Sequence, residues 1–209
     1  GKLVLEQACR QLKDWGAKYG NDVPLAVSVN LSAKQLMHSD VIRLVKDIIS
    51  ETQISPRSLK LEVTESMVME NADLALQILS ELCALGVRVS SDDFGTGYSS
   101  LSYLHKFPFD RLKIDRSFIS KMDKDDKSEE IVRTIILLSK NLGIEVVAEG
   151  IENEEQYKRL SELGCRFGQG FLFSRPVNNV DAEVILRDGL KFVQETGWTP
   201  SVENLIGGA

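Results

Sequence analysis

The stretch Val87-Arg88-Val89-Ser90-Ser91-Asp92-Asp93-Phe94-Gly95-Thr96-Gly97 runs from an apolar, strand-like segment through two adjacent carboxylates into a glycine-rich loop. Its valines fall on one face of a strand and its polar residues on the other, because strand side chains alternate. Two neighbouring carboxylates repel each other and are stabilised where cations lie between them. Such a pair is typical of two-metal sites that cleave phosphodiesters. The alternative is an ordinary Asp-Asp turn before a glycine loop.

Outward from this stretch, short strand-like segments alternate with amphipathic helical ones. Strands are predicted at Leu25–Leu31, Leu59–Thr64, Val87–Asp92, Arg111–Asp115, Ile144–Glu149 and Arg166–Phe171. Helices are predicted at Leu3–Tyr19, Leu36–Thr52, Ala72–Leu85, Glu129–Leu142, Glu154–Leu163 and Val180–Glu195. Three helices end at a glycine directly before a strand, at Gly86, Gly143 and Gly164, where glycine takes the left-handed cap. Regular alternation of strand and helix predicts parallel strands with crossover helices.

The faces of these strands favour a closed barrel over an open sheet. The central strands of a doubly wound sheet are apolar on both faces, whereas each strand here has a polar face. We therefore expect an α/β fold of the (β/α)8, TIM-like type, with its site at the carboxyl ends of the strands. Because only six strands are found, the first two are expected to be missing from this chain. The barrel is expected to cover residues 1–195, and residues 196–209 to form a C-terminal tail.

Polar side chains gather at or near the carboxyl ends of the predicted strands: Asn30, Glu62, Asp92, Lys113 and Glu149. Like charges about 4 Å apart repel by about 4 kcal/mol at an effective dielectric near 20, so several carboxylates in one barrel mouth would attract cations. Carboxylate and amide oxygens suit Mg²⁺ or Mn²⁺. The alternative is a buried network of ion pairs without catalysis.

Composition excludes several classes of function. The formal net charge of −6 argues against binding a nucleic-acid polymer, since that needs clustered Lys and Arg. Three widely spaced cysteines, Cys9, Cys83 and Cys165, give no zinc-binding spacing and indicate reduced thiols in a cytoplasmic protein. No stretch is long and apolar enough for a membrane span, so no membrane contact is expected.

Six motifs in order resemble the EAL domain, the bacterial cyclic di-GMP phosphodiesterase family. They are Val29-Asn30-Leu31-Ser32, Leu61-Glu62-Val63-Thr64-Glu65, the Asp-Asp stretch from Asp92 to Leu101, Lys113-Ile114-Asp115-Arg116-Ser117-Phe118, Val147-Ala148-Glu149-Gly150-Ile151-Glu152 and Gly168-Gln169-Gly170-Phe171. The resemblance implies hydrolysis of cyclic di-GMP to linear pGpG at a two-metal site with Mg²⁺ or Mn²⁺.

The resemblance also assigns roles to single residues. Asn30, Glu62, Asp92 and Asp93 match metal ligands, with Asp92 as the bridging carboxylate. Lys113 matches the lysine beside the attacking water, and Glu149 matches a general base or metal-side ligand. Glu65 matches the glutamate that anchors the Asp-Asp loop, while Glu152 and Gln169 match residues of the site wall.

The chain contains no Glu-Ala-Leu tripeptide, which lies on an early strand of the family. That strand is expected upstream of residue 1, in a longer protein with sensory or GGDEF domains. The alternative function is a non-catalytic module for cyclic di-GMP binding or dimerisation. The resemblance further implies a homodimer formed partly through the Asp-Asp loop and residues 100–106.

Overall fold

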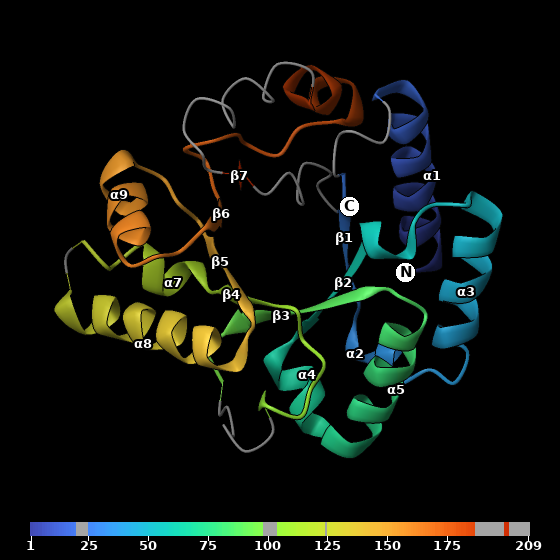
Figure 1. Ribbon diagram of the computed structural model, residues 1–209, viewed down its shortest axis with the longest axis horizontal. Helices are drawn as coiled ribbons and strands as arrows, with labels where there is room; N and C mark the ends of the chain where they lie inside the picture. The colour runs from blue at the N-terminus through green and yellow to red at the C-terminus, as the bar shows by residue number, and fades with distance from the viewer. Residues whose placement is uncertain (20–24, 98–103, 124, 187–198, 201–209) are drawn as a thin grey trace. The chain divides into compact units, whose positions relative to one another are not determined.

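The structure is a computed structural model that describes residues 1–19, 25–97, 104–123, 125–186 and 199–200. The chain divides into two compact units. The first comprises residues 1–92 and 97–110, and the second comprises residues 93–96 and 111–209. Each unit combines parallel strands with helices (Figure 1). The predicted boundary at residue 195 lies outside the described residues.

The first unit carries three parallel strands in chain order: β1 (Val27–Asn30), β2 (Leu59–Thr64) and β3 (Arg88–Phe94), of which the last two residues belong to the second unit. Val29 pairs with Leu61, and Leu61 with Val89, so the apolar faces of the strands form one row. Three long helices accompany them, α1 (Lys2–Tyr19), α3 (Val41–Thr52) and α5 (Ala72–Ala84), and α3 packs on both others (Figure 1).

The predicted helix Leu36–Thr52 is wrong at its start, because the structure divides it in two. A short α2 (Ala33–Leu36) is closed at its beginning by a capping box between Ser32 and Gln35, and α3 begins only at Val41. A 3₁₀ turn, η1 (Pro56–Ser58), precedes β2, and α4 (Glu65–Glu70) follows it directly. These short elements are too brief to leave an apolar period in the sequence.

The second unit carries four parallel strands in chain order: β4 (Arg111–Ile114), β5 (Glu145–Glu149), β6 (Phe167–Gln169) and the two-residue β7 (Thr199–Pro200). Its helices are α7 (Arg116–Ile119), α8 (Asp126–Leu142), α9 (Glu154–Glu162) and residues 179–186. Figure 1 shows α7, α8 and α9 along one side of β4, β5 and β6. β7 lies within residues 196–209, which the sequence assigns to a C-terminal tail.

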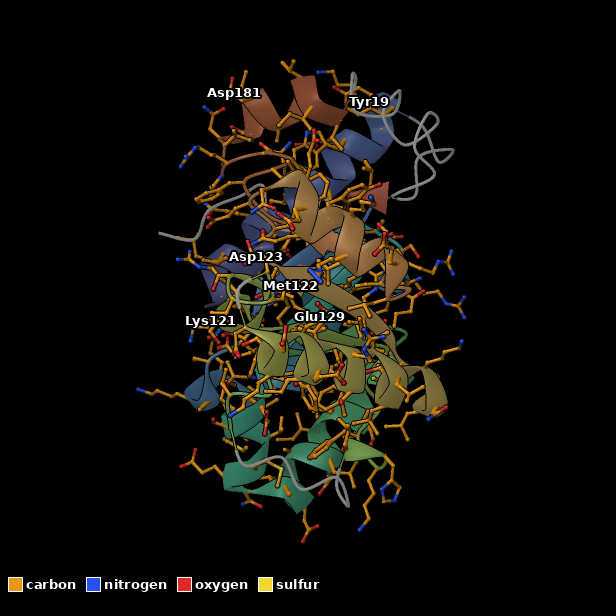
Figure 2. All side chains as sticks on the ribbon, turned by 90° about the vertical axis from the view of Figure 1, so that its left-hand side faces the viewer. Tyr19, Lys121, Met122, Asp123, Glu129 and Asp181 are labelled. Atoms are coloured by element: carbon orange, nitrogen blue, oxygen red, sulfur yellow. The ribbon has the colours of Figure 1, made fainter. Side chains whose placement is uncertain are left out.

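Packing between the helices of the second unit combines an apolar core with a bridging carboxylate. Met122, in the turn after α7, is buried, whereas its neighbour Lys121 is exposed (Figure 2). Glu129 of α8 pairs through one oxygen with Arg133 of the same helix at 3.1 Å and through the other with Arg159 of α9 at 3.0 Å. This second ion pair fixes α9 against α8.

The predicted fold class is confirmed. Each of the six predicted strands overlaps an observed one, and the strands are parallel with helices between them, as in an α/β TIM-like fold. Gly86, Gly143 and Gly164 all take the predicted left-handed conformation. No helix among the described residues is both long and apolar enough to cross a bilayer.

Candidate active site

In the first unit, three predicted site residues share one face at the carboxyl ends of the strands. Asn30 of β1 pairs in register with Glu62 of β2, and Thr64, two residues further along β2, pairs with Asp92 of β3. Side chains two residues apart on a strand point to the same side, so Asn30, Glu62 and Asp92 lie in one polar row. Glu62 is only 1% exposed, which places a carboxylate among buried groups.

In the second unit, the half-buried carboxylate of Glu149 is held from two sides. Lys113 Nζ of β4 lies 2.6 Å from Glu149 Oε1 of β5, and Gln169 Nε2 of β6 donates a hydrogen bond to the same oxygen at 2.8 Å. The side chains of Lys113 and Glu149 are 3% and 14% exposed. Two donors on one oxygen fix the orientation of the carboxylate. The structure thus brings together three of the residues singled out from the sequence.

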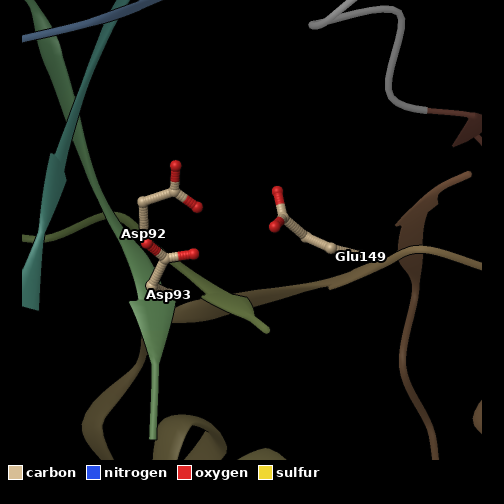
Figure 3. Close-up of side chains that lie close together, drawn as sticks. All are labelled: Asp92, Asp93 and Glu149. Atoms are coloured by element: carbon tan, nitrogen blue, oxygen red, sulfur yellow. The ribbon is translucent and has the colours of Figure 1, made fainter. Parts of the chain in front are cut away.

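Asp93 belongs to the same unit and extends this cluster. It offers a carboxylate oxygen within 4.8 Å of one from Glu149. Its backbone φ of 54° is positive, which is uncommon for a residue other than glycine. A left-handed residue breaks the alternation of a strand, and Figure 3 shows Asp93 and the preceding Asp92 extending to the same side. Such strained backbone is typical of functional sites.

Glu65 lies where the predicted loop anchor should be. It is the first residue of α4 and is 5% exposed. A Cβ atom added to Gly97 in the same unit would lie 3.0 Å from Glu65 Oε1, so the start of the loop passes directly over this carboxylate. The residues at 98–103 lie outside the described part of the chain, and with them most of the segment predicted to form a dimer.

A pocket of about 240 Å³ opens beside the second-unit cluster. Its lining includes the predicted residues Glu149, Glu152 and Gln169. It also includes Arg116, Phe171, Phe173, Arg175 and Pro176, none of which sequence reasoning assigned to the site. Arg116 and Phe171 do occur within motifs quoted above, and their place in those motifs is the sequence signal that could have identified them as pocket residues. The pocket therefore joins the acidic cluster to an aromatic and cationic wall.

The three cysteines offer no reactive thiolate. Burial raises the pKa of Cys9 and of Cys165 to about 11, and burial together with the negative charge of Asp110 raises that of Cys83 to about 11. A nucleophilic cysteine needs a lowered pKa. The chemistry of this site accordingly rests on carboxylates, the lysine and the amide.

Comparisons with known proteins place the chain in a family. A sequence profile of the EAL domain matches residues 1–176. The signalling protein YkoW of Bacillus subtilis is 48% identical over 177 residues, which cover 85% of this chain and 22% of that protein. The bifunctional diguanylate cyclase/cyclic di-GMP phosphodiesterase MucR of Pseudomonas aeruginosa is 45% identical over 85% of this chain and 26% of its own length. The chain thus spans about a quarter of these curated relatives.

Solved structures give the same result. The MucR phosphodiesterase in complex with cyclic di-GMP is similar with a TM-score of 0.80 and 44% identity, over 84% of this chain and 70% of that one. BlrP1 of Klebsiella pneumoniae, solved with manganese and cyclic di-GMP, is similar with a TM-score of 0.74 and 31% identity, over 83% of this chain and 43% of the BlrP1 chain. The same protein was also solved with calcium and cyclic di-GMP. With its sequence matched over residues 1–176 and its fold shared with these structures, the chain belongs to the EAL domain family.

Proposed function

We propose that the protein hydrolyses cyclic di-GMP to linear pGpG in bacterial second-messenger signalling. In this reaction water attacks one phosphorus, the P–O3′ bond breaks and the released 3′ oxygen takes up a proton. The observation that carries the proposal is the Glu149 carboxylate, held at 2.6 Å by Lys113 and within 4.8 Å of Asp93, in a chain of the EAL domain family. Relatives named as cyclic di-GMP phosphodiesterases support the choice of substrate.

The donor set fits a divalent metal ion. Asp93 and Glu149 place carboxylate oxygens within 4.8 Å of each other, and Asn30, Glu62 and Asp92 present an amide and two carboxylates at neighbouring strand ends. Hard oxygen ligands select ions such as Mg²⁺ and Mn²⁺. We assign Asn30, Glu62, Asp92 and Asp93 as ligands of a two-metal site, with Asp92 as the bridge. Such ions supply Lewis-acid stabilisation of the phosphoryl oxygens and acidify water.

The remaining residues orient groups and move protons. We assign Glu149 to accept a proton from the attacking water, with Lys113 and Gln169 holding its carboxylate in place. We assign the Lys113 ammonium, beside the attacking water, to stabilise negative charge on the phosphate. Glu65 is assigned to anchor the Asp-Asp loop, which passes over its carboxylate at Gly97, and Glu152 to line the substrate pocket.

The setting of the domain is part of the proposal. The curated relatives are several times longer than this chain, which supports further sensory or GGDEF domains in the natural protein. We propose a homodimer and a cytoplasmic location. Three unpaired, mostly buried cysteines fit the reducing cytoplasm.

The test is turnover of cyclic di-GMP with Mg²⁺ or Mn²⁺, followed by chromatography of pGpG. Asp92→Asn removes the bridging charge and is expected to lower turnover by several orders of magnitude, because metal stabilisation is worth several kcal/mol. Asp47→Asn, an exposed aspartate on α3, is the control and should retain full activity. Binding of cyclic di-GMP without release of pGpG would instead select the non-catalytic module, and full activity of Asp92→Asn would contradict the two-metal assignment.

A further inference from the structure

Arg116 lines the pocket of the second unit together with Glu149, Glu152 and Gln169. It is the first residue of α7, directly after β4 and the Asp115 cap. The hydrolysis described above gives this exposed arginine no role. Its placement is nevertheless specific, and the reason lies in the neighbouring glycine.

Gly150 makes room for the Arg116 side chain. A Cβ atom on Gly150 would lie 2.6 Å from Cγ, 2.7 Å from Cβ and 2.9 Å from Cδ of Arg116. These distances are far below van der Waals contact, so the aliphatic part of the arginine occupies the space that any other side chain at 150 would need. The backbone of Gly150, at φ +73°, also favours glycine. The aliphatic part of Arg116 therefore packs against Gly150, the residue that follows Glu149.

The guanidinium of Arg116 is not used to balance charge within the described residues. Two glutamates line the same pocket, yet no ion pair of Arg116 occurs in the described part of the chain. Arg175, the other cation of the lining, instead lies over the Phe171 ring, 4.5 Å from its centroid. Arg116 therefore keeps its hydrogen-bond donors available to a ligand.

The lining favours a nucleobase as the group that meets Arg116. Phe171, Phe173 and Pro176 provide apolar surface for a flat ring, which a phosphate alone would not use. Guanine presents two acceptors, O6 and N7, that match a guanidinium in bidentate fashion, and N–H donors that match a carboxylate. Adenine has an amino donor in place of O6 and loses the first match.

We propose that Arg116 is a specificity residue that recognises a guanine base of the substrate through O6 and N7. This inference rests on the proposed function, since it takes the ligand to be cyclic di-GMP. It assigns guanine selectivity to a residue outside the metal ligands and outside the Lys113–Glu149 pair.

The test compares binding of cyclic di-GMP and cyclic di-AMP by calorimetry in Ca²⁺, an ion with which a related structure holds cyclic di-GMP. Arg116→Ala is expected to weaken cyclic di-GMP about 10- to 100-fold, the range of a bidentate base contact, and to leave cyclic di-AMP nearly unchanged. Arg116→Lys should behave like the alanine variant, because a lysine keeps the charge and loses the fork. Arg57→Ala, an exposed arginine of the first unit, should change neither affinity.

Each other outcome overturns the inference in a recognisable way. Equal weakening of both dinucleotides by Arg116→Ala, with affinity restored in Arg116→Lys, would mean that the arginine binds phosphate. Unchanged affinities in Arg116→Ala, or loss of selectivity in Arg175→Ala alone, would remove the assignment while the proposed function stands. Failure of the unsubstituted protein to bind cyclic di-GMP would remove both.

Discussion

Replacing Lys113 by Met should destabilise the protein by about 3 kcal/mol. The ammonium lies 2.6 Å from Glu149 Oε1, and the two side chains are 3% and 14% exposed. At an effective dielectric near 20 their attraction is about 6 kcal/mol, which the desolvation of both groups offsets in large part. Removing one member of a buried pair costs about 3–5 kcal/mol. The lower end applies because Glu149 keeps its hydrogen bond from Gln169.

Urea unfolding followed by circular dichroism measures this change. With an m-value of about 2 kcal/mol per molar, the midpoint should fall by about 1.5 M. Arg133→Met removes two ion pairs from α8, with Glu129 and Glu130, where the arginine is 51% exposed, and should cost about 1 kcal/mol or less. In Lys113→Met/Glu149→Gln neither charge of this pair remains, so much of the loss should be regained. A Lys113→Met midpoint no lower than that of Arg133→Met, or simple additivity in the double variant, would refute the reasoning.

Two further predictions concern packing and pH. Gly150→Ala should be clearly less stable in thermal unfolding than Gly143→Ala, because both glycines have φ near +70° but only Gly150 lies against Arg116. An added Cβ on Gly150 would also meet Arg116 Cβ, so the relief needs Arg116→Gly: in that background Gly150→Ala should cost about as much as Gly143→Ala does alone. Equal losses in the two single variants would contradict the contact. The thiols of Cys9 and Cys165 have pKa values of about 11 in the folded protein, against 9.0 for an ordinary thiol. The unfolded chain therefore loses these protons first as pH rises, so the stabilisation from the protonated thiols is complete below pH 9 and is lost as pH rises to 11. Cys165→Ala should flatten this decline in a pH series of unfolding free energies, and an unaltered slope would argue against the raised pKa.

Much of the fold could be predicted from local patterns, because its strands and their turns depend on neighbouring residues. Alternating valines and polar residues located β1, β2 and β3, and the glycines before β3, β5 and β6 located the ends of three helices. The division of Leu36–Thr52 could not be predicted in this way. Apolar spacing runs from Leu36 and Met37 on to Val41, whereas the break itself lies between the C-cap of α2 at Met37 and the N-cap of α3 at Asp40.

The same distinction applies to the site. Lys113 and Glu149 were predictable because strand alternation alone places both on the polar face, and their long side chains can meet across neighbouring strands. Asp93 is different, since alternation predicts that it faces away from Asp92, and only the positive φ at Asp93 turns it to the same side. Arg116 depends on a contact with Gly150, 34 residues further along the chain. Candidate site residues placed by strand alternation can thus be identified from the sequence pattern, whereas Asp93 was identified only through the family resemblance and Arg116 only from the structure.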